Sequence, residues 1–261
     1  MGRTIAFANQ KGGVGKTTTC VNLAAALALQ RKRVLVVDMD PQGNATVGCG
    51  IDRARVRVNA YHVLMDEVSI REAVTDAPGG GFQVVPGNSD VTAAEVALMD
   101  AEGREQQLRR QLARVRDNYD YILVDCPPSL NILTVNALVA ANGVLMPIQC
   151  EYYALEGLTA LLNTIRRVQQ NANRELIIQG LLRTMFDPRN NLANQVSAQL
   201  LQHFPKQVYN TVIPRNVRLA EAPSHGQSAL QYDRYSRGAL AYMALASELL
   251  RKDQAAAATT A

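Results

Sequence analysis

The stretch TIAFANQKGGVGKTTTCVNLAAALAL, residues 4–29, decides the fold of this chain. Its apolar start has the length of a β-strand, its middle is a glycine-rich turn that ends in Gly-Lys-Thr, and its alanine- and leucine-rich end is typical of a helix. Because glycine has no Cβ atom, the turn can curl and point successive backbone N–H groups at a phosphate. The start of the following helix adds its positive dipole end at the same place. The stretch therefore predicts a strand, a phosphate-binding loop and a helix.

The loop carries two lysines, and both are predicted to act at bound phosphates. Lys16 can reach the β- and γ-phosphates, while the hydroxyl group of Thr17 can ligate Mg²⁺. Lys11 stands directly before the paired glycines, and it would repel Lys16 unless a polyphosphate lay nearby. The alternative is a glycine-rich hairpin that carries lysines without binding a nucleotide. The other loop residues predicted to contact the nucleotide are Gly12, Gly13, Val14, Gly15 and Thr18.

Composition favours one large α/β domain. The chain has 261 residues, of which 48% are hydrophobic and 19% charged, so it can bury a full core. We expect the domain to span residues 1–252 and residues 253–261 to form a frayed or disordered tail. No run approaches the roughly 18 uninterrupted apolar residues of a membrane span.

The cysteines and the start of the chain predict a cytoplasmic protein. No signal peptide is recognisable at the N-terminus. The cysteines are spaced too widely for a zinc knuckle or a redox pair, so we expect reduced and mostly buried thiols. These residues are Cys20, Cys49, Cys126 and Cys150.

Positive charge is concentrated in the C-terminal third. Residues 166–238 contain ten basic and four acidic residues, a net charge of +6, whereas the whole chain carries +4. A basic region on an otherwise balanced protein can contact a polyanion without making the entire surface adhesive. The C-terminal third is therefore the candidate region for binding a polyanion.

Two further predicted strands end in aspartate. The runs 33–38 and 119–125 are predicted to be strands buried on both faces of a parallel sheet, and they end at Asp38 and Asp125. Polar groups at the carboxyl ends of parallel strands gather at one edge, so both carboxylates are expected to face the phosphate-binding loop and support Mg²⁺ or its water shell. Asp40 is expected to orient the attacking water. The alternative for Asp38 is that it caps the turn that follows.

Two later segments are predicted to form the pocket for the nucleotide base. Met185, Pro214 and Asn216 combine apolar walls with an amide that can recognise the edge of a purine. An equally open alternative is that these residues belong to turns that close the sheet. With the phosphate-binding loop, the first interpretation predicts ATP and Mg²⁺ as cofactors.

The remaining pattern completes the α/β fold class. We expect a single-domain P-loop NTPase, with a mostly parallel twisted sheet flanked by helices on both faces. Further strands are predicted at 82–86, 143–148 and 177–185. Further helices are predicted at 58–65, 69–74, 92–99, 105–116, 132–141, 158–170 and 237–252.

Several strings together resemble the deviant Walker A ATPases of the MinD/ParA group. They are KGGVGKTT at 11–18, DMDPQGNAT at 38–46 and VDCPPS at 124–129. Two more strings are similar to the chromosomal ParA/Soj partitioning ATPases, QCEYYALEG at 149–157 and VIPRNVRLAEAPSHG at 212–226. The resemblance extends from about residue 3 to about residue 250 and is loosest over 51–117.

This resemblance implies a slow, Mg²⁺-dependent ATPase that forms a nucleotide-sandwich homodimer. Lys11 of one subunit would reach the phosphates bound to the other, so that catalysis uses Lys11, Lys16 and Asp40. Family members bind double-stranded DNA non-specifically as ATP-bound dimers, and the matching basic residues here are Arg189 and Arg218. A ParB-type centromere-binding protein would stimulate hydrolysis and release the dimer, which implies a nucleoid-associated location.

The chain departs from the family pattern near the predicted DNA-binding face. Gln227 and Ser228 stand where a lysine and a proline are common, and Arg234-Tyr235 stands where a Pro-Arg pair is common. The core chemistry is unaffected by these changes. The predicted DNA-binding arginines also fit a second interpretation, as ordinary solvated surface residues.

Two other functions remain open. A membrane-surface positioning ATPase like MinD requires a basic amphipathic C-terminal helix, but residues 253–261 contain neither bulky apolar residues nor lysines. A metabolic relative of the nitrogenase iron protein requires cluster-ligating cysteines, and only Cys126 stands in a suitable segment. The favoured hypothesis is therefore a partitioning ATPase that does not bind membranes.

Overall fold

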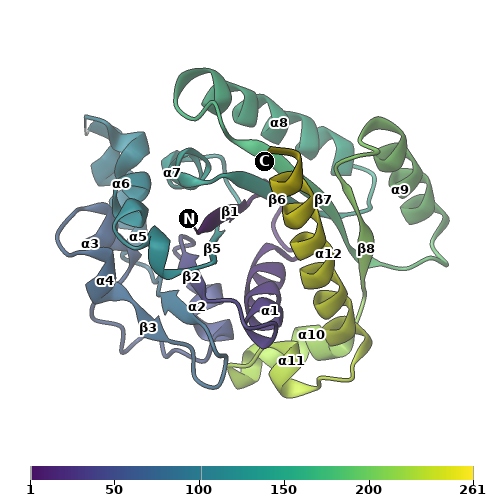
Figure 1. The fold of residues 1–261 in the computed structure, drawn as a ribbon, viewed down its shortest axis with the longest axis horizontal. Helices are drawn as coiled ribbons and strands as arrows, with labels where there is room; N and C mark the ends of the chain where they lie inside the picture. Colours follow the sequence, from purple (N-terminus) through teal and green to yellow (C-terminus); the bar gives the residue numbers. More distant parts are fainter. Residues whose placement is uncertain (1, 101, 261) are drawn as a thin grey trace.

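The computed structural model describes residues 2–100 and 102–260, which form one α/β unit around an eight-stranded sheet (Figure 1). The strand order is β3-β4-β2-β5-β1-β6-β7-β8. Neighbouring strands run parallel, except for the short antiparallel pair of β3 and β4 at one edge. This arrangement confirms the predicted mostly parallel sheet. The strands are β1 (Arg3–Phe7), β2 (Val34–Asp38), β3 (Thr75–Asp76), β4 (Gln83–Val85), β5 (Tyr121–Asp125), β6 (Gly143–Gln149), β7 (Ile177–Phe186) and β8 (Val208–Pro214).

Helices cover both faces of the sheet, and each face has its own hydrophobic core. The helices against the first core are α3 (Ala60–Leu64), α4 (Ile70–Ala73), α5 (Val91–Ala97), α6 (Gln107–Ala113), α7 (Ile132–Ala140), α8 (Ala154–Asn171) and α9 (Asn191–His203). The helices against the second core are α1 (Lys16–Leu29), α2 (Asn44–Gly48), α10 (Val217–Glu221), α11 (Ala229–Tyr232) and α12 (Arg237–Thr260).

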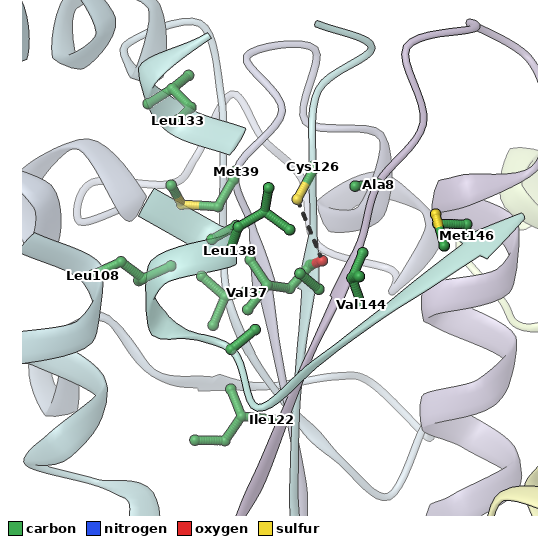
Figure 2. Close-up of a cluster of buried hydrophobic side chains, with 14 of the residues drawn as sticks. Ala8, Val37, Met39, Leu108, Ile122, Cys126, Leu133, Leu138, Val144 and Met146 are labelled. Carbon is green, nitrogen blue, oxygen red and sulfur yellow. Dashed lines mark hydrogen bonds between the residues drawn. The ribbon is translucent and has the colours of Figure 1, made fainter. Parts of the chain in front are cut away.

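Alternate residues of the central strands contribute to the two cores. In β2, Leu35 and Val37 belong to the first core, whereas Val34 and Val36 belong to the second. Figure 2 shows the first core, with Val37 of β2 and Leu138 of α7 among its members. Because both faces of the sheet are covered, such a strand needs an apolar residue at every position. This explains the continuous apolar runs in the sequence.

Most predicted elements are present, but some boundaries differ. The sequence analysis did not predict β8 or α9. Helix α12 continues past its predicted end at Lys252 to Thr260, so residues 253–260 of the expected tail are helical, and Ala261 lies outside the described residues. The predicted helix 105–116 is the shorter α6, flanked by turns of 3₁₀ helix. All four cysteines are free and buried, as predicted.

A polar cluster at the amino ends of the strands holds the end of α12. Asp253 accepts hydrogen bonds from Arg3 and, at 2.7 Å, from the hydroxyl group of Tyr121. Gln179 Nε2 donates to Asp253 Oδ1 at 3.5 Å, and Gln179 Oε1 accepts from Arg3 Nη2 at 2.5 Å. These contacts join the first strand, the centre of the sheet and the last helix. They lie just beyond Lys252 and hold the helix in place where the sequence analysis expected it to end.

We expect Asp253→Ala to lower the free energy of unfolding by about 1 to 3 kcal/mol, because three donors lose one shared and mostly buried acceptor. The side chain of Asp253 is only 16% exposed. Urea denaturation followed by circular dichroism measures the change. Gln254→Ala alters the next, exposed residue and is the matched control. Equal unfolding midpoints for both variants and the parent would contradict this assignment.

Candidate nucleotide-binding site

The loop between β1 and α1 has the backbone shape that the glycine-rich sequence predicts. Gly13 and Gly15 have φ values of 72° and 87°, in the left-handed region that glycine adopts without a Cβ clash. The hydroxyl group of Thr19 donates to Gly15 O at 2.6 Å, and that of Thr184 in β7 donates to Val14 O at 2.8 Å. The loop is therefore fixed both from its own helix and from a distant strand.

Lys16 is enclosed by this loop and is only 6% exposed. Its Nζ atom donates to Lys11 O at 3.3 Å. Burial lowers the pKa of Lys16, and the nearby carboxylates of Asp125 and Asp40 oppose part of this change. The ammonium group is therefore confined beside the acidic strand ends, where it can pair with phosphate oxygens.

Asp125 lies beside the hydroxyl group that was predicted to ligate Mg²⁺. Thr17 Oγ1 donates to Asp125 Oδ2 at 2.7 Å, while Asp125 Oδ1 is buried without a hydrogen-bond partner in the structure. Burial raises the pKa of Asp125 well above its usual range, and the neighbouring charge of Asp38 adds to the increase. A buried, unpartnered carboxylate oxygen next to a threonine hydroxyl fits a hydrated divalent cation. The donor set is therefore suitable for Mg²⁺.

Asp38 is fully buried and is paired in register with Asp125 across the two strands. Its Oδ2 atom accepts hydrogen bonds from the backbone N–H of Thr46 at 2.8 Å and from the Thr46 hydroxyl at 2.7 Å. Burial raises the pKa of Asp38 to about 6, although these hydrogen bonds oppose the change. The arrangement favours the alternative in which Asp38 fixes the following turn. Its role in Mg²⁺ binding stays a prediction.

Asp40 lies in the turn that Asp38 organises. It is 7% exposed, and its Oδ1 atom accepts a hydrogen bond from the backbone N–H of Gln42 at 3.0 Å. Asp40 and Gln42 both line the cavity described next. The remaining carboxylate oxygen of Asp40 is thus available to a water molecule in that cavity.

A cavity of about 570 Å³ opens beside the loop and has the size of a nucleotide site. It brings together the phosphate-binding loop and the predicted base pocket, although these segments are far apart in sequence. The predicted residues among its lining are Gly12, Gly13, Gly15, Lys16, Thr17, Thr18, Asp40, Met185, Pro214 and Asn216. The predicted residues outside the lining are Lys11, Val14, Asp38 and Asp125.

The base end of the cavity contains an unpaired polar atom. Asn216 Oδ1 is buried without a hydrogen-bond partner in the structure. Met185 has a φ of 48°, which is uncommon for a non-glycine residue and is characteristic of functional sites. These observations favour the base-pocket interpretation over simple turn residues.

Sequence reasoning missed part of the cavity wall. Leu219, Ala220 and Pro223 line it from α10 and the short turn that follows. The string 212–226 was singled out only for its resemblance, because no helix was predicted there. The adjacent apolar residues Leu219 and Ala220 within that string were the signal from which a cavity wall could have been predicted.

Lys11 lies at the edge of the site in an ion pair with Glu151. The two side chains are 40% and 46% exposed, so the pair is accessible to solvent. The backbone N–H of Lys11 donates to Asn9 Oδ1 at 3.0 Å, which fixes the start of the loop. The sequence analysis did not predict a role for Glu151, because the pairing depends on the meeting of β1 and β6.

The two arginines predicted to bind DNA are exposed and lie outside the cavity lining. Arg189 pairs with Asp187 at 2.7 Å. Arg218 pairs with Glu221 at 2.8 Å and with Asp233 at 3.3 Å. Both cations are therefore accessible to solvent but partly offset by neighbouring carboxylates.

The fold, the loop and the cavity define a phosphate-loop nucleotide-binding domain. Residues 2–178 match the protein family described as an AAA domain. The chain is 52% identical to the sporulation initiation inhibitor protein Soj of Bacillus subtilis, covering 95% of this chain and 98% of that protein. It is 48% identical to the chromosome partitioning protein ParA of Caulobacter vibrioides, covering 97% and 95% of the two chains. The chain therefore belongs to the ParA/Soj family of chromosome-partitioning ATPases.

Solved structures agree with this class. A crystal structure described as cobyrinic acid a,c-diamide synthase from Mycobacterium smegmatis, with bound ADP and magnesium, has a TM-score of 0.86 and 38% identity. It covers 97% of this chain and 96% of that one. The cell division ATPase MinD of Pyrococcus furiosus has a TM-score of 0.78 and 26% identity, covering 96% and 99% of the two chains. Within residues 2–100 and 102–260, no helix is both long and apolar enough to cross a membrane.

We expect Asp125→Asn to unfold at a higher temperature than the parent when nucleotide and divalent metal are removed with a chelator. The substitution removes a buried negative charge beside Asp38 while keeping an acceptor for Thr17. Because the folded-state pKa of Asp125 is raised, its ionisation costs stability as the pH rises above the unfolded value. The advantage of the variant should therefore grow as the pH rises above about 4, the usual pKa of an aspartate.

Scanning calorimetry at several pH values measures this difference. Asp117→Asn changes an exposed aspartate and is the matched control. If the difference in unfolding temperature between Asp125→Asn and the parent does not change with pH, burial does not raise the pKa of the Asp125 carboxyl group.

Proposed function

We propose that this chain is an ATP-dependent dimer switch for chromosome or plasmid partitioning. In this proposal it hydrolyses ATP slowly with Mg²⁺, forms a nucleotide-sandwich homodimer and binds double-stranded DNA without sequence preference. A ParB-type centromere-binding protein stimulates hydrolysis and releases the dimer from the nucleoid. Membership of the ParA/Soj family supports the partitioning role.

The position of Lys11 is the observation that best supports a dimer. Lys16 is buried in its own nucleotide cavity, whereas Lys11 is half-exposed, pairs with Glu151 and does not line that cavity. A cation at the rim of the site is placed to act on a nucleotide presented from outside. A second copy of the same chain, facing the first, presents such a nucleotide by symmetry.

In this proposal, different residues bind the phosphates, hold Mg²⁺, orient the water and stabilise the developing charge. The backbone N–H groups of the loop and Lys16 hold the phosphates, while Thr17 and Asp125 are suited to hold Mg²⁺. Mg²⁺ would neutralise charge on the phosphate oxygens when bound. Asp40 orients the attacking water, and Lys11 of the second subunit stabilises the charge that develops during transfer. Hydrolysis is slow because one carboxylate positions the water without strongly activating it.

DNA binding follows from having two copies of a weak basic surface. Arg189 and Arg218 of each subunit contact phosphates, and the dimer binds with both surfaces at once. Dissociation after hydrolysis separates the two surfaces, so the affinity falls without any base being recognised. ATP thereby controls DNA binding.

The Asp40→Ala variant tests the whole proposal. Without the water-orienting carboxylate, the ATP-bound dimer should persist and remain on DNA, while Lys16→Ala should not respond to ATP. Binding to an arbitrary DNA duplex is measured by fluorescence anisotropy with ATP, with ADP and without nucleotide over a salt series. We expect an ATP-only signal that falls at least about 100-fold between roughly 50 and 200 mM salt. Equal binding in all three states, or a parental hydrolysis rate in Asp40→Ala, would refute the proposal.

The Gly12→Val variant separates folding from dimer formation. A Cβ atom at Gly12 meets nothing within 4 Å inside the subunit, so the variant should fold and bind ATP. Extra side-chain bulk at the rim should instead block a facing subunit. Light scattering with ATP should report dimers for Asp40→Ala and single subunits for the double variant Gly12→Val with Asp40→Ala. Dimers of the double variant would show that this surface is not the interface.

A further inference from the structure

Five exposed arginines form a basic strip next to the nucleotide cavity (Arg189, Arg215, Arg218, Arg234 and Arg237). They come from the β7–α9 loop, from α10 and its approach, and from the turn between α11 and α12. Figure 1 shows α10 and α11 lying against the start of α12. Asp233, which pairs with Arg218 at 3.3 Å, directly precedes Arg234. The turn therefore adjoins the predicted DNA-binding residue Arg218.

The charges of this strip are not equally available to a partner. Arg189 donates two hydrogen bonds to Asp187, and Arg218 pairs with both Glu221 and Asp233. Among the described residues, Arg234 has no carboxylate partner. A phosphate that approaches Arg189 or Arg218 must compete with a carboxylate, whereas one that approaches Arg234 does not.

Arg234 is held by an aromatic ring instead of an acid. Its guanidinium lies over the ring of Tyr235, 5.3 Å from the ring centre. Tyr235 is 78% exposed, the largest exposed fraction among the large apolar and aromatic side chains of the described residues. The stacked ring limits the motion of the guanidinium but leaves its N–H groups free, so less entropy is lost when an anion binds. The Tyr235 hydroxyl adds a second donor.

The backbone of the turn is also fixed. The N–H of Tyr235 donates to Asp233 Oδ1 at 3.3 Å, and the N–H of Ala239 donates to Ser236 Oγ at 3.2 Å. Ser236 is buried at the start of α12. The Arg234–Tyr235 pair therefore stands on a rigid support rather than on a mobile loop.

The turn is in contact with the wall of the nucleotide cavity. A Cβ atom on Gly238, at the start of α12, would lie 2.6 Å from Leu219 and 3.1 Å from Asn216 Oδ1. Leu219 and Asn216 line the cavity. The start of α12, directly after the Arg234–Tyr235 turn, therefore packs closely against residues of the cavity wall.

We propose that Arg234 and Tyr235 form a further contact for the sugar-phosphate backbone of double-stranded DNA, used in addition to Arg189 and Arg218. This inference rests on the proposed function and names a part of its DNA-binding surface. Each subunit contributes one Arg234–Tyr235 pair, so a dimer gains two phosphate contacts. In this proposal the pair contacts only phosphate and sugar oxygens, and such contacts carry no sequence information.

The test compares Arg234→Ala with Arg251→Ala in the full-length chain with ATP and an arbitrary DNA duplex. Arg251 is an exposed arginine near the other end of α12, so its removal changes the net charge equally. We expect Arg234→Ala to weaken binding about threefold to tenfold and to reduce the slope of log affinity against log salt by about 2, for two lost phosphate contacts per dimer. Arg251→Ala should match the parent. ATP hydrolysis and dimer formation without DNA should be unchanged in both variants.

Two further variants separate charge from stacking. Arg234→Lys should keep the salt slope but lose part of the affinity, because an ammonium group stacks poorly on the ring. Tyr235→Leu should weaken binding to a similar extent while the charge is unchanged. Parental affinity for DNA in all three Arg234 and Tyr235 variants would overturn the inference.

The controls distinguish this inference from the function on which it rests. If Arg218→Ala abolishes ATP-dependent DNA binding while Arg234→Ala has no effect, the proposed function stands and only this inference fails. If the parent shows no ATP-dependent DNA binding, both fail. Loss of binding to phosphatidylglycerol vesicles, with parental DNA binding, would assign the pair to a membrane surface and also overturn the inference.

Discussion

The burial of two neighbouring carboxylates is the constraint on which the rest of the site depends. Asp38 and Asp125 end adjacent parallel strands in register, and both are completely buried. Two negative charges at this separation in a low-dielectric interior raise each other's pKa and destabilise the fold unless positive charge lies nearby. Lys16 supplies one such charge from the phosphate-binding loop, and hydrogen bonds from Thr17 and Thr46 supply further stabilisation. The same arrangement therefore favours the binding of a divalent cation beside the two carboxylates.

The cavity depends on contacts between the two ends of the chain. Thr184 in β7 binds Val14 in the loop, and Tyr242 in α12 lies 3.2 Å from the Thr19 hydroxyl in α1. Asn216, directly before α10, lines the base end of the cavity, and Arg218 within α10 is exposed to solvent. The base end of the cavity and the basic strip therefore share the short helix α10.

The sequence predicted the centre of the sheet better than its edge, for a physical reason. Strands β2 and β5 are covered on both faces and read as unbroken apolar runs, whereas β8 at the sheet edge mixes exposed and buried positions and was missed. Helix α9 was missed as well, because its buried residues are separated by glutamine and asparagine. The turn between β1 and α1 was predicted because the glycines that its backbone requires are local in the sequence. The pairing of Lys11 with Glu151 and the docking of Asp253 depend on tertiary contacts that no local pattern reports.

The ion pair between Lys11 and Glu151 is weak enough for a bound phosphate to displace Glu151 from the lysine. Both side chains are nearly half exposed, and ion pairs of this kind contribute only about 0 to 1 kcal/mol. A bound triphosphate presents several negative charges, so it competes easily with one solvated carboxylate for the lysine. A diphosphate presents fewer charges and lacks the terminal group that faces a partner subunit. Under the proposed function, Glu151 therefore holds Lys11 only loosely between cycles, and the charge of the terminal phosphate decides whether the lysine stays in its own subunit or crosses to the other.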